Sequence, residues 1–183
     1  MNRLFWGAIF AFLNFDLNFG DMTVGLLPGF VGWYLIWKGL TELRDQSVHF
    51  EKVRTAAIML IAYSAVIYVL ALLPFPVNFG WVSVLLRVLA SALSLYVMYG
   101  MIRGIQDLEV RCGTKLNGAS MLQIWKFDVV LELCDLVVTL LSVPAAALIL
   151  TIAVVVLKIL LLIRLCKARN AYQNRPLGEI SSI

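Results

Sequence analysis

The chain has 183 residues, of which 62% are hydrophobic and only 14% are charged, and its mean hydropathy is +0.92. Soluble domains are about 45–50% apolar and about 25% charged, so a soluble core of this size cannot absorb so much apolar surface. The composition therefore excludes a soluble protein and predicts an integral membrane protein. The net charge of +4 does not indicate nucleic-acid binding, because most Lys and Arg residues adjoin hydrophobic segments, where they act as orientation signals.

Six hydrophobic segments follow one another along the chain, and we expect each to be a transmembrane helix. They comprise residues 4–19, 23–43, 55–73, 81–102, 121–141 and 145–165. Short connections join them in pairs, which predicts a compact all-α bundle of six helices in three hairpins. Residues 1–169 would form this single transmembrane domain, and residues 170–183 a polar tail.

The first segment is the shortest of the six. At 1.5 Å per residue it is about 24 Å long, less than the hydrocarbon core of about 30 Å. Its end is polar, with Asn14, Asp16 and Asn18. Two interpretations stay open for residues 4–19: a full span, or a short interfacial or re-entrant helix on the outer side.

The second segment contains helix-breaking and small residues. Pro28-Gly29 predicts a kink, which membrane helices tolerate where neighbouring groups satisfy the freed carbonyls. Gly25, Gly29 and Gly32 have small-residue spacing and predict the close approach of another backbone.

The connections between the segments differ in charge. Residues 44–54 predict a charged loop and residues 74–80 an uncharged turn with two prolines. Residues 103–120 are polar and charged, with turn signals at Cys112-Gly113 and Asn117-Gly118.

The distribution of Lys and Arg predicts the orientation. If all six segments span, almost all basic residues lie at the N-terminus, in residues 44–54 and 103–120, in the tail, or in the adjoining last turns, which include Lys38, Lys126 and Lys158. The loops on the other side contain no Lys or Arg, and only Arg87 lies near that side. The positive-inside rule then places both termini in the cytoplasm. We expect a multi-pass protein of the plasma membrane.

The fifth segment carries a polar stripe on an otherwise apolar helix. Its members are spaced three or four residues apart and fall within an arc of roughly 100°. They are Trp125, Asp128, Glu132, Asp135, Thr139 and Ser142. Such a helix either lies flat on the membrane or spans it with its stripe shielded by neighbours. We favour spanning, because a flat helix would leave the basic tail on the outer side.

Ionisable residues inside a membrane are costly, and this makes the stripe a candidate site. Arg87 and Asp135 each lie about six residues, or roughly 9 Å, below the outer ends of their helices. Asp16 is slightly shallower, Glu132 lies nearer the midplane and Asp128 in the inner half. With Asn14, these residues form the predicted intramembrane polar cluster.

The cluster has two interpretations. In one, Arg87 and Asp135 form a buried pair that fixes helix packing. In the other, a cavity open to the outside binds an anionic ligand at Arg87, or a cationic ligand at Asp135 and Glu132. Without a cationic partner, Glu132 should carry a proton at neutral pH, because burial disfavours a charged carboxylate.

Motifs of catalytic and metal sites are absent from the sequence. It has no HExxH, GxSxG or P-loop motif and only one histidine, so we expect no enzymatic activity, cofactor or metal. In size and topology the chain resembles the small substrate-binding membrane subunits of energy-coupling-factor vitamin transporters. This resemblance implies about six helices and a ligand site near the outer face.

Two functions follow from the sequence. The first is a non-catalytic accessory or interaction subunit, with the lipid bilayer and a membrane or cytoplasmic protein as partners. The second is a solute-binding or transport protein that uses Arg87, Asp135 and Glu132. A pocket of several hundred cubic ångströms at these residues would favour the second.

Overall fold

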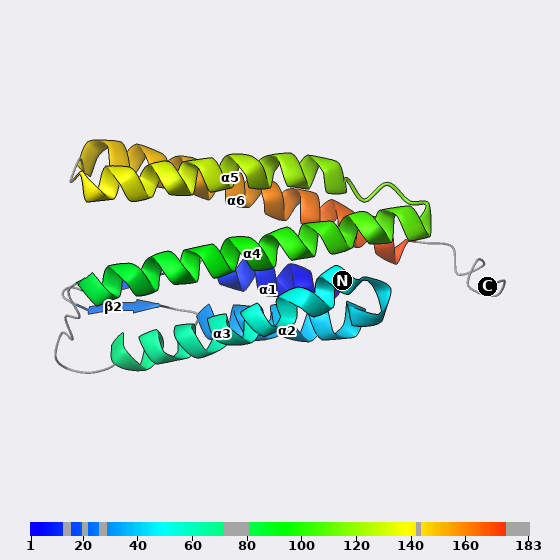
Figure 1. Cartoon of the computed structure of the whole chain (residues 1–183), viewed down its shortest axis with the longest axis horizontal. Helices are drawn as coiled ribbons and strands as arrows, with labels where there is room; N and C mark the ends of the chain where they lie inside the picture. The colour runs from blue at the N-terminus through cyan, green and yellow to red at the C-terminus, as the bar shows by residue number, and fades with distance from the viewer. Residues whose placement is uncertain (13–15, 20–21, 26–28, 72–80, 142–143, 175–183) are drawn as a thin grey trace. The chain divides into compact units, whose positions relative to one another are not determined.

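The computed structural model describes residues 1–12, 16–19, 22–25, 29–71, 81–141 and 144–174 (Figure 1). Over these ranges the chain is mainly helical and contains one short β-hairpin. The elements are α1 (Asn2–Phe12), β1 (Asp16–Phe19), β2 (Met22–Gly25), α2 (Gly29–Leu43), the 3₁₀ turn η1 (Arg44–Gln46), α3 (Val48–Ala71), α4 (Trp81–Cys112), α5 (Gly118–Leu140) and α6 (Pro144–Gln173).

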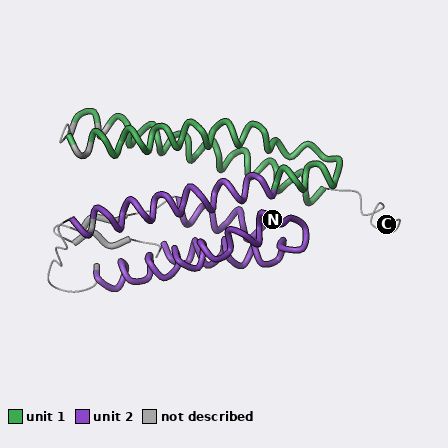
Figure 2. Tube along the Cα trace, viewed as in Figure 1, with its two compact units in different colours: residues 1, 105–183 green, residues 2–104 purple. Residues whose placement is uncertain are grey.

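The chain divides into two compact units (Figure 2). Unit 2 comprises residues 2–104 and contains α1, the β-hairpin, α2, α3 and most of α4. Unit 1 comprises Met1 and residues 105–183, and it contains the end of α4 with α5 and α6. Each unit has its own packing and is described by itself.

Three helices are long and apolar enough to cross a membrane. Their apolar stretches are Val48–Leu70, Val84–Cys112 and Ile149–Gln173, with mean hydropathies of 1.9, 1.7 and 2.7. The prediction of helices that could span a membrane is thus confirmed for these three. Helices α1 and α2 have only 11 and 15 residues, and α5 carries Lys126 and three acidic residues, so the six-span arrangement stays a prediction.

Helices α1 and α2 pack closely in unit 2 because glycines face their contact. A Cβ on Gly32 would clash with the backbone of Phe10 and Ala11, and one on Gly7 would clash with the backbone of Ile36. The close backbone approach predicted at Gly32 is therefore confirmed. Fully buried Leu4 of α1 lies in this contact and also meets Gly39 of α2.

The first two hydrophobic segments are not continuous helices, which corrects the predicted helical spans 4–19 and 23–43. Helix α1 ends at Phe12, and β1 pairs with β2 in antiparallel register, Asp16 with Gly25 and Phe19 with Met22. Polar and apolar residues alternate in β1, from Asp16 and Leu17 to Asn18 and Phe19, which is the period of a strand. The apolar content of this region obscured the change from helical to strand periodicity. Pro28 lies outside the described residues.

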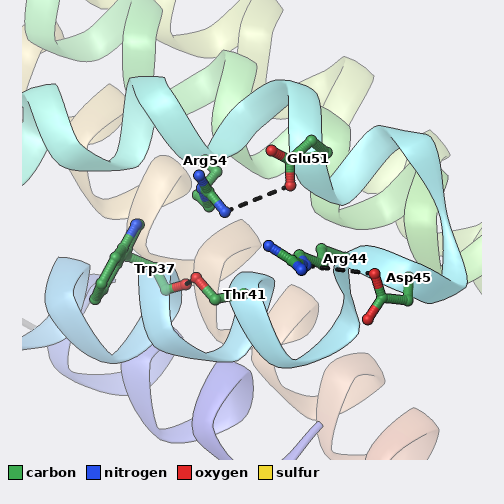
Figure 3. Close-up of polar contacts among 6 residues, drawn as sticks. All are labelled: Trp37, Thr41, Arg44, Asp45, Glu51 and Arg54. Atoms are coloured by element: carbon green, nitrogen blue, oxygen red, sulfur yellow. Dashed lines mark hydrogen bonds and ion pairs between the residues drawn. The ribbon is translucent and has the colours of Figure 1, made fainter.

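The predicted charged loop at residues 44–54 is also wrong. Only η1 and Ser47 separate α2 from α3, and α3 begins at Val48 (Figure 3). Figure 3 shows the local polar contacts that accompany this turn, including Arg54 to Glu51 at 3.6 Å and Thr41 Oγ1 donating to the Trp37 carbonyl oxygen at 2.8 Å.

Several helices continue past the apolar segments that predicted them. Helix α4 runs ten residues past the predicted end at position 102, to Cys112, and α6 runs to Gln173 instead of 165. Hydropathy marks where the lipid core would end, whereas a helix continues through charged residues of good helix propensity until a turn signal stops it. Gly113 and Asn117 adopt positive φ angles of 60° and 61° between α4 and α5, which confirms both predicted turn signals.

The predicted turn at residues 74–80, residues 142–143 of the predicted turn 142–144 and most of the tail lie outside the described residues, while Pro144 begins α6. Of the predicted tail 170–183, residues up to Gln173 belong to α6, because the polar sequence there keeps helical hydrogen bonding: the Asn174 amide donates to the Asn170 carbonyl at 3.0 Å.

Candidate functional site

The polar stripe of α5 meets α6 within unit 1. The two helices run side by side and pack against each other (Figure 1). Asp128, Glu132 and Asp135 are spaced four and three residues apart, so the α-helical period places them on one face of α5. The structure thus keeps Asp128, Glu132 and Asp135 of the predicted stripe on one face, and Glu132 meets α6 there. Ser142, which ends the predicted stripe, lies outside the described residues.

An ion pair joins the two helices at the middle of this stripe. Lys158 Nζ of α6 lies 3.1 Å from Glu132 Oε1 and donates a hydrogen bond to it. The side chains retain only 23% and 17% of their accessible surface, respectively. Glu132 therefore has a cationic partner. We expected Glu132 to carry a proton at neutral pH only if it lacked such a partner, so that expectation does not apply.

Lys158 is the site residue that the sequence analysis missed. We interpreted it as an orientation signal near the end of its helix, but α6 runs on to Gln173 and places Lys158 near its middle. A signal was present in the sequence, since Lys158 is the only charged residue among positions 145–163. An isolated charge in so apolar a helix indicates a partner inside the membrane.

Asp128 is the most deeply buried charged residue of the site. It is 2% exposed, and both of its carboxylate oxygens are buried without a hydrogen-bond partner in the described part of the chain. Lys158 attracts its negative charge, and Glu132, one turn further along α5, repels it. Lys158 therefore attracts two carboxyl groups, those of Glu132 and Asp128.

Asp135 lies one turn beyond Glu132 on the same face of α5. Its Oδ1 atom is buried and has no hydrogen-bond partner among the described residues, while the side chain as a whole is half-buried. Arg87 belongs to unit 2 and Asp135 to unit 1, so the Arg87–Asp135 pair stays a prediction.

Arg87 lines a groove of about 490 Å³ within unit 2. The other lining residues are Ala62, Tyr63, Val66, Ile67 and Leu70 of α3 and Leu86 of α4. Arg87 is exposed, and among the described residues it makes no ion pair. The groove combines an apolar wall with a single cation, a combination that suits an anionic amphiphile better than a small polar solute.

Two members of the predicted cluster, Asp16 and Asn14, lie before α2 in the chain, and only Asp16 is among the described residues. Asp16 lies in β1, so its place at the end of a first transmembrane helix is corrected by the β-hairpin. Asn14 lies outside the described residues. No group of three or more potential metal ligands gathers among the residues that the structure describes.

Comparison with known proteins gives no relative for this arrangement. No family model matches the chain, and neither a curated protein nor a solved structure matches it significantly. The resemblance to vitamin-transporter subunits therefore rests on chain size and expected topology alone.

Proposed function

We propose that the chain is a multi-pass protein of the plasma membrane that acts without catalysis, as an accessory or interaction subunit. The observation that carries this proposal is the Lys158–Glu132 pair, at 3.1 Å and largely shielded. The pair uses two intramembrane charges to hold α5 against α6, which is the role expected of a structural contact rather than of an open ligand site.

The positions of the basic residues support a membrane orientation with both termini in the cytoplasm. In unit 2, Arg3, Lys38, Arg44 and Arg54 lie where α1 begins, α2 ends and α3 begins. In unit 1, basic residues lie before α5 and near the end of α6: Arg111, Lys115, Arg164, Lys167 and Arg169. Apart from Arg87 in unit 2 and Lys158 in unit 1, most basic residues of each unit thus lie toward one end of its helices, as the positive-inside rule predicts. The same distribution supports α5 and α6 crossing together as a hairpin.

Thiol labelling of intact cells tests this proposal. In a variant whose three native cysteines are replaced by serine, Glu132→Cys should resist a membrane-impermeant thiol reagent, because packing against α6 seals the position. Trp81→Cys serves as the accessible control, since Trp81 begins α4 on the proposed outer side and is 79% exposed. Val130→Cys serves as the lipid-facing control, with 57% exposure on α5. Rapid labelling of Glu132→Cys would reject a sealed contact.

A second candidate function is solute binding or transport. It is favoured by the two oxygens of Asp128, which accept no hydrogen bond from the described residues, and by the groove at Arg87. The groove volume of about 490 Å³ falls within the 300–1,000 Å³ typical of ligand sites. Under this alternative, the position of Glu132 or Asp135 faces water at some stage of the cycle. The labelling experiment decides between the two, because only a water-filled path admits the reagent.

A further inference from the structure

Two acids of the α5–α6 contact, Asp128 and Glu132, share the charge of one lysine, Lys158. Asp128 and Glu132 are four residues apart on one face of α5, and Lys158 is the cation that faces both. The lysine hydrogen-bonds Glu132 and leaves Asp128 without a hydrogen bond from any described residue. With both acids ionised, the three groups would carry one net negative charge.

The surroundings of Asp128 make that negative charge costly. The residue is 2% exposed, and neither carboxylate oxygen accepts a hydrogen bond from any residue that the structure describes. A carboxylate in an apolar interior loses its hydration, and without hydrogen bonds this loss is not compensated. Such groups therefore take up a proton or bind a cation. Buried Leu161 and Leu162 of α6 add apolar surface one turn beyond Lys158 and supply no polar group.

We propose that Asp128 is a binding site for a single proton. While the proton is bound, Asp128 is a neutral carboxylic acid, Lys158 pairs with Glu132, and the three groups sum to zero charge. When the proton passes to water, Asp128 becomes a carboxylate and Lys158 turns from Glu132 toward it. The long lysine side chain can make this change because the two acids are separated by only one helical turn. The groups that control the exchange are Lys158 of α6 and Glu132 of α5.

This inference goes beyond the proposed accessory function and does not depend on it. The Lys158–Glu132 contact alone would suffice to join two helices, whereas Asp128 adds a buried acid that no packing role requires. The site gives the hairpin two pairings, Lys158 with Glu132 or Lys158 with Asp128, and proton binding selects between them.

Infrared spectroscopy of the full chain in lipid nanodiscs tests the proposal directly. The wild type should show the C=O stretch of a buried carboxylic acid at mildly acidic and neutral pH, and the band should shift in D₂O. Asp128→Asn should remove this band, and Asp128→Glu should restore it. Asp45→Asn is the matched control, because the Asp45 side chain is 86% exposed and its loss should leave the band unchanged.

The Glu132→Gln variant tests whether Lys158 can exchange Glu132 for Asp128 as its partner. It retains Asp128 but frees Lys158, which should then pair with Asp128 and abolish the acid band at neutral pH. A wild type without the band, or an acid band that persists in Asp128→Asn, would overturn the proposal. So would a band that appears only when Na⁺ is withdrawn, because the bound ion would then be sodium. Persistence of the band in Glu132→Gln would likewise refute the exchange of partners.

Discussion

Lys158 Nζ and Glu132 Oε1 meet at 3.1 Å across the contact between α5 and α6, although the two residues are 26 positions apart in the chain. Lys158 also attracts the buried carboxyl group of Asp128. The three side chains therefore act as one unit, and their substitutions should not have independent effects.

Lys158→Met should be the most destabilising single substitution in this group. It leaves two acids without a cation in a contact from which water is largely excluded, and removing one partner of a buried pair costs about 3 kcal/mol or more. Thermal unfolding of the purified protein in detergent measures the change. Arg44→Gln is the control, because the exposed Arg44–Asp45 pair should contribute only about 0–1 kcal/mol.

Glu132→Gln should lower the unfolding temperature less than Lys158→Met. Lys158 keeps a second carboxyl partner in this variant, so no cation is left buried alone. The double variant Glu132→Gln with Lys158→Met should recover part of the loss caused by Lys158→Met, since one of the two uncompensated acids is removed. Strictly additive losses would contradict a shared lysine.

Asp128→Leu should leave stability unchanged or raise it by about 1 kcal/mol. The substitution replaces a buried acid, which has no hydrogen bond within the described part of the chain, by an apolar residue of similar shape, and this removes a desolvation penalty. The unfolding temperature in the same detergent checks this. A large decrease would show that Asp128 makes a stabilising contact.

Arg87→Ala should change stability by no more than about 0.5 kcal/mol, because Arg87 is exposed at the groove that it lines. The test compares the unfolding temperatures of the wild type, Arg87→Ala, Asp135→Ala and the double variant. If the single variants are strongly destabilised and the double variant recovers, Arg87 and Asp135 form the structural pair that the sequence suggested.

Gly32→Val should loosen the contact between α1 and α2. The new side chain would clash with the backbone of Phe10 and Ala11, and overpacking of this kind costs about 1–3 kcal/mol. Gly113→Asn is the contrasting variant, because Gly113 has open space around it and asparagine tolerates its positive φ. An unfolding temperature equal to that of the wild type for Gly32→Val would contradict the close approach.

Features that depend on local sequence were predicted well. The turn signals at Gly113 and Asn117, the small-residue contact at Gly32 and the polar face of α5 follow from residue type and spacing, and the structure contains all three. The helix ends were predicted poorly, because hydropathy reports the thickness of the lipid core and not the extent of backbone hydrogen bonding. The β-hairpin was missed because each strand has only four residues, too short an alternation to stand out between the longer apolar segments on either side.

The sequence by itself determined that the chain is largely helical, that it has segments apolar enough to cross a membrane, and that α5 carries a polar stripe, since composition and periodicity are properties of a single segment. Only the tertiary structure decided which charges meet. It paired Glu132 with Lys158, left Asp128 buried beside them, and moved Asp16 from a helix to a strand. The physical reason is that an ion pair depends on how two helices align along their length, and that alignment is set by the packing of both faces, which neither segment encodes alone.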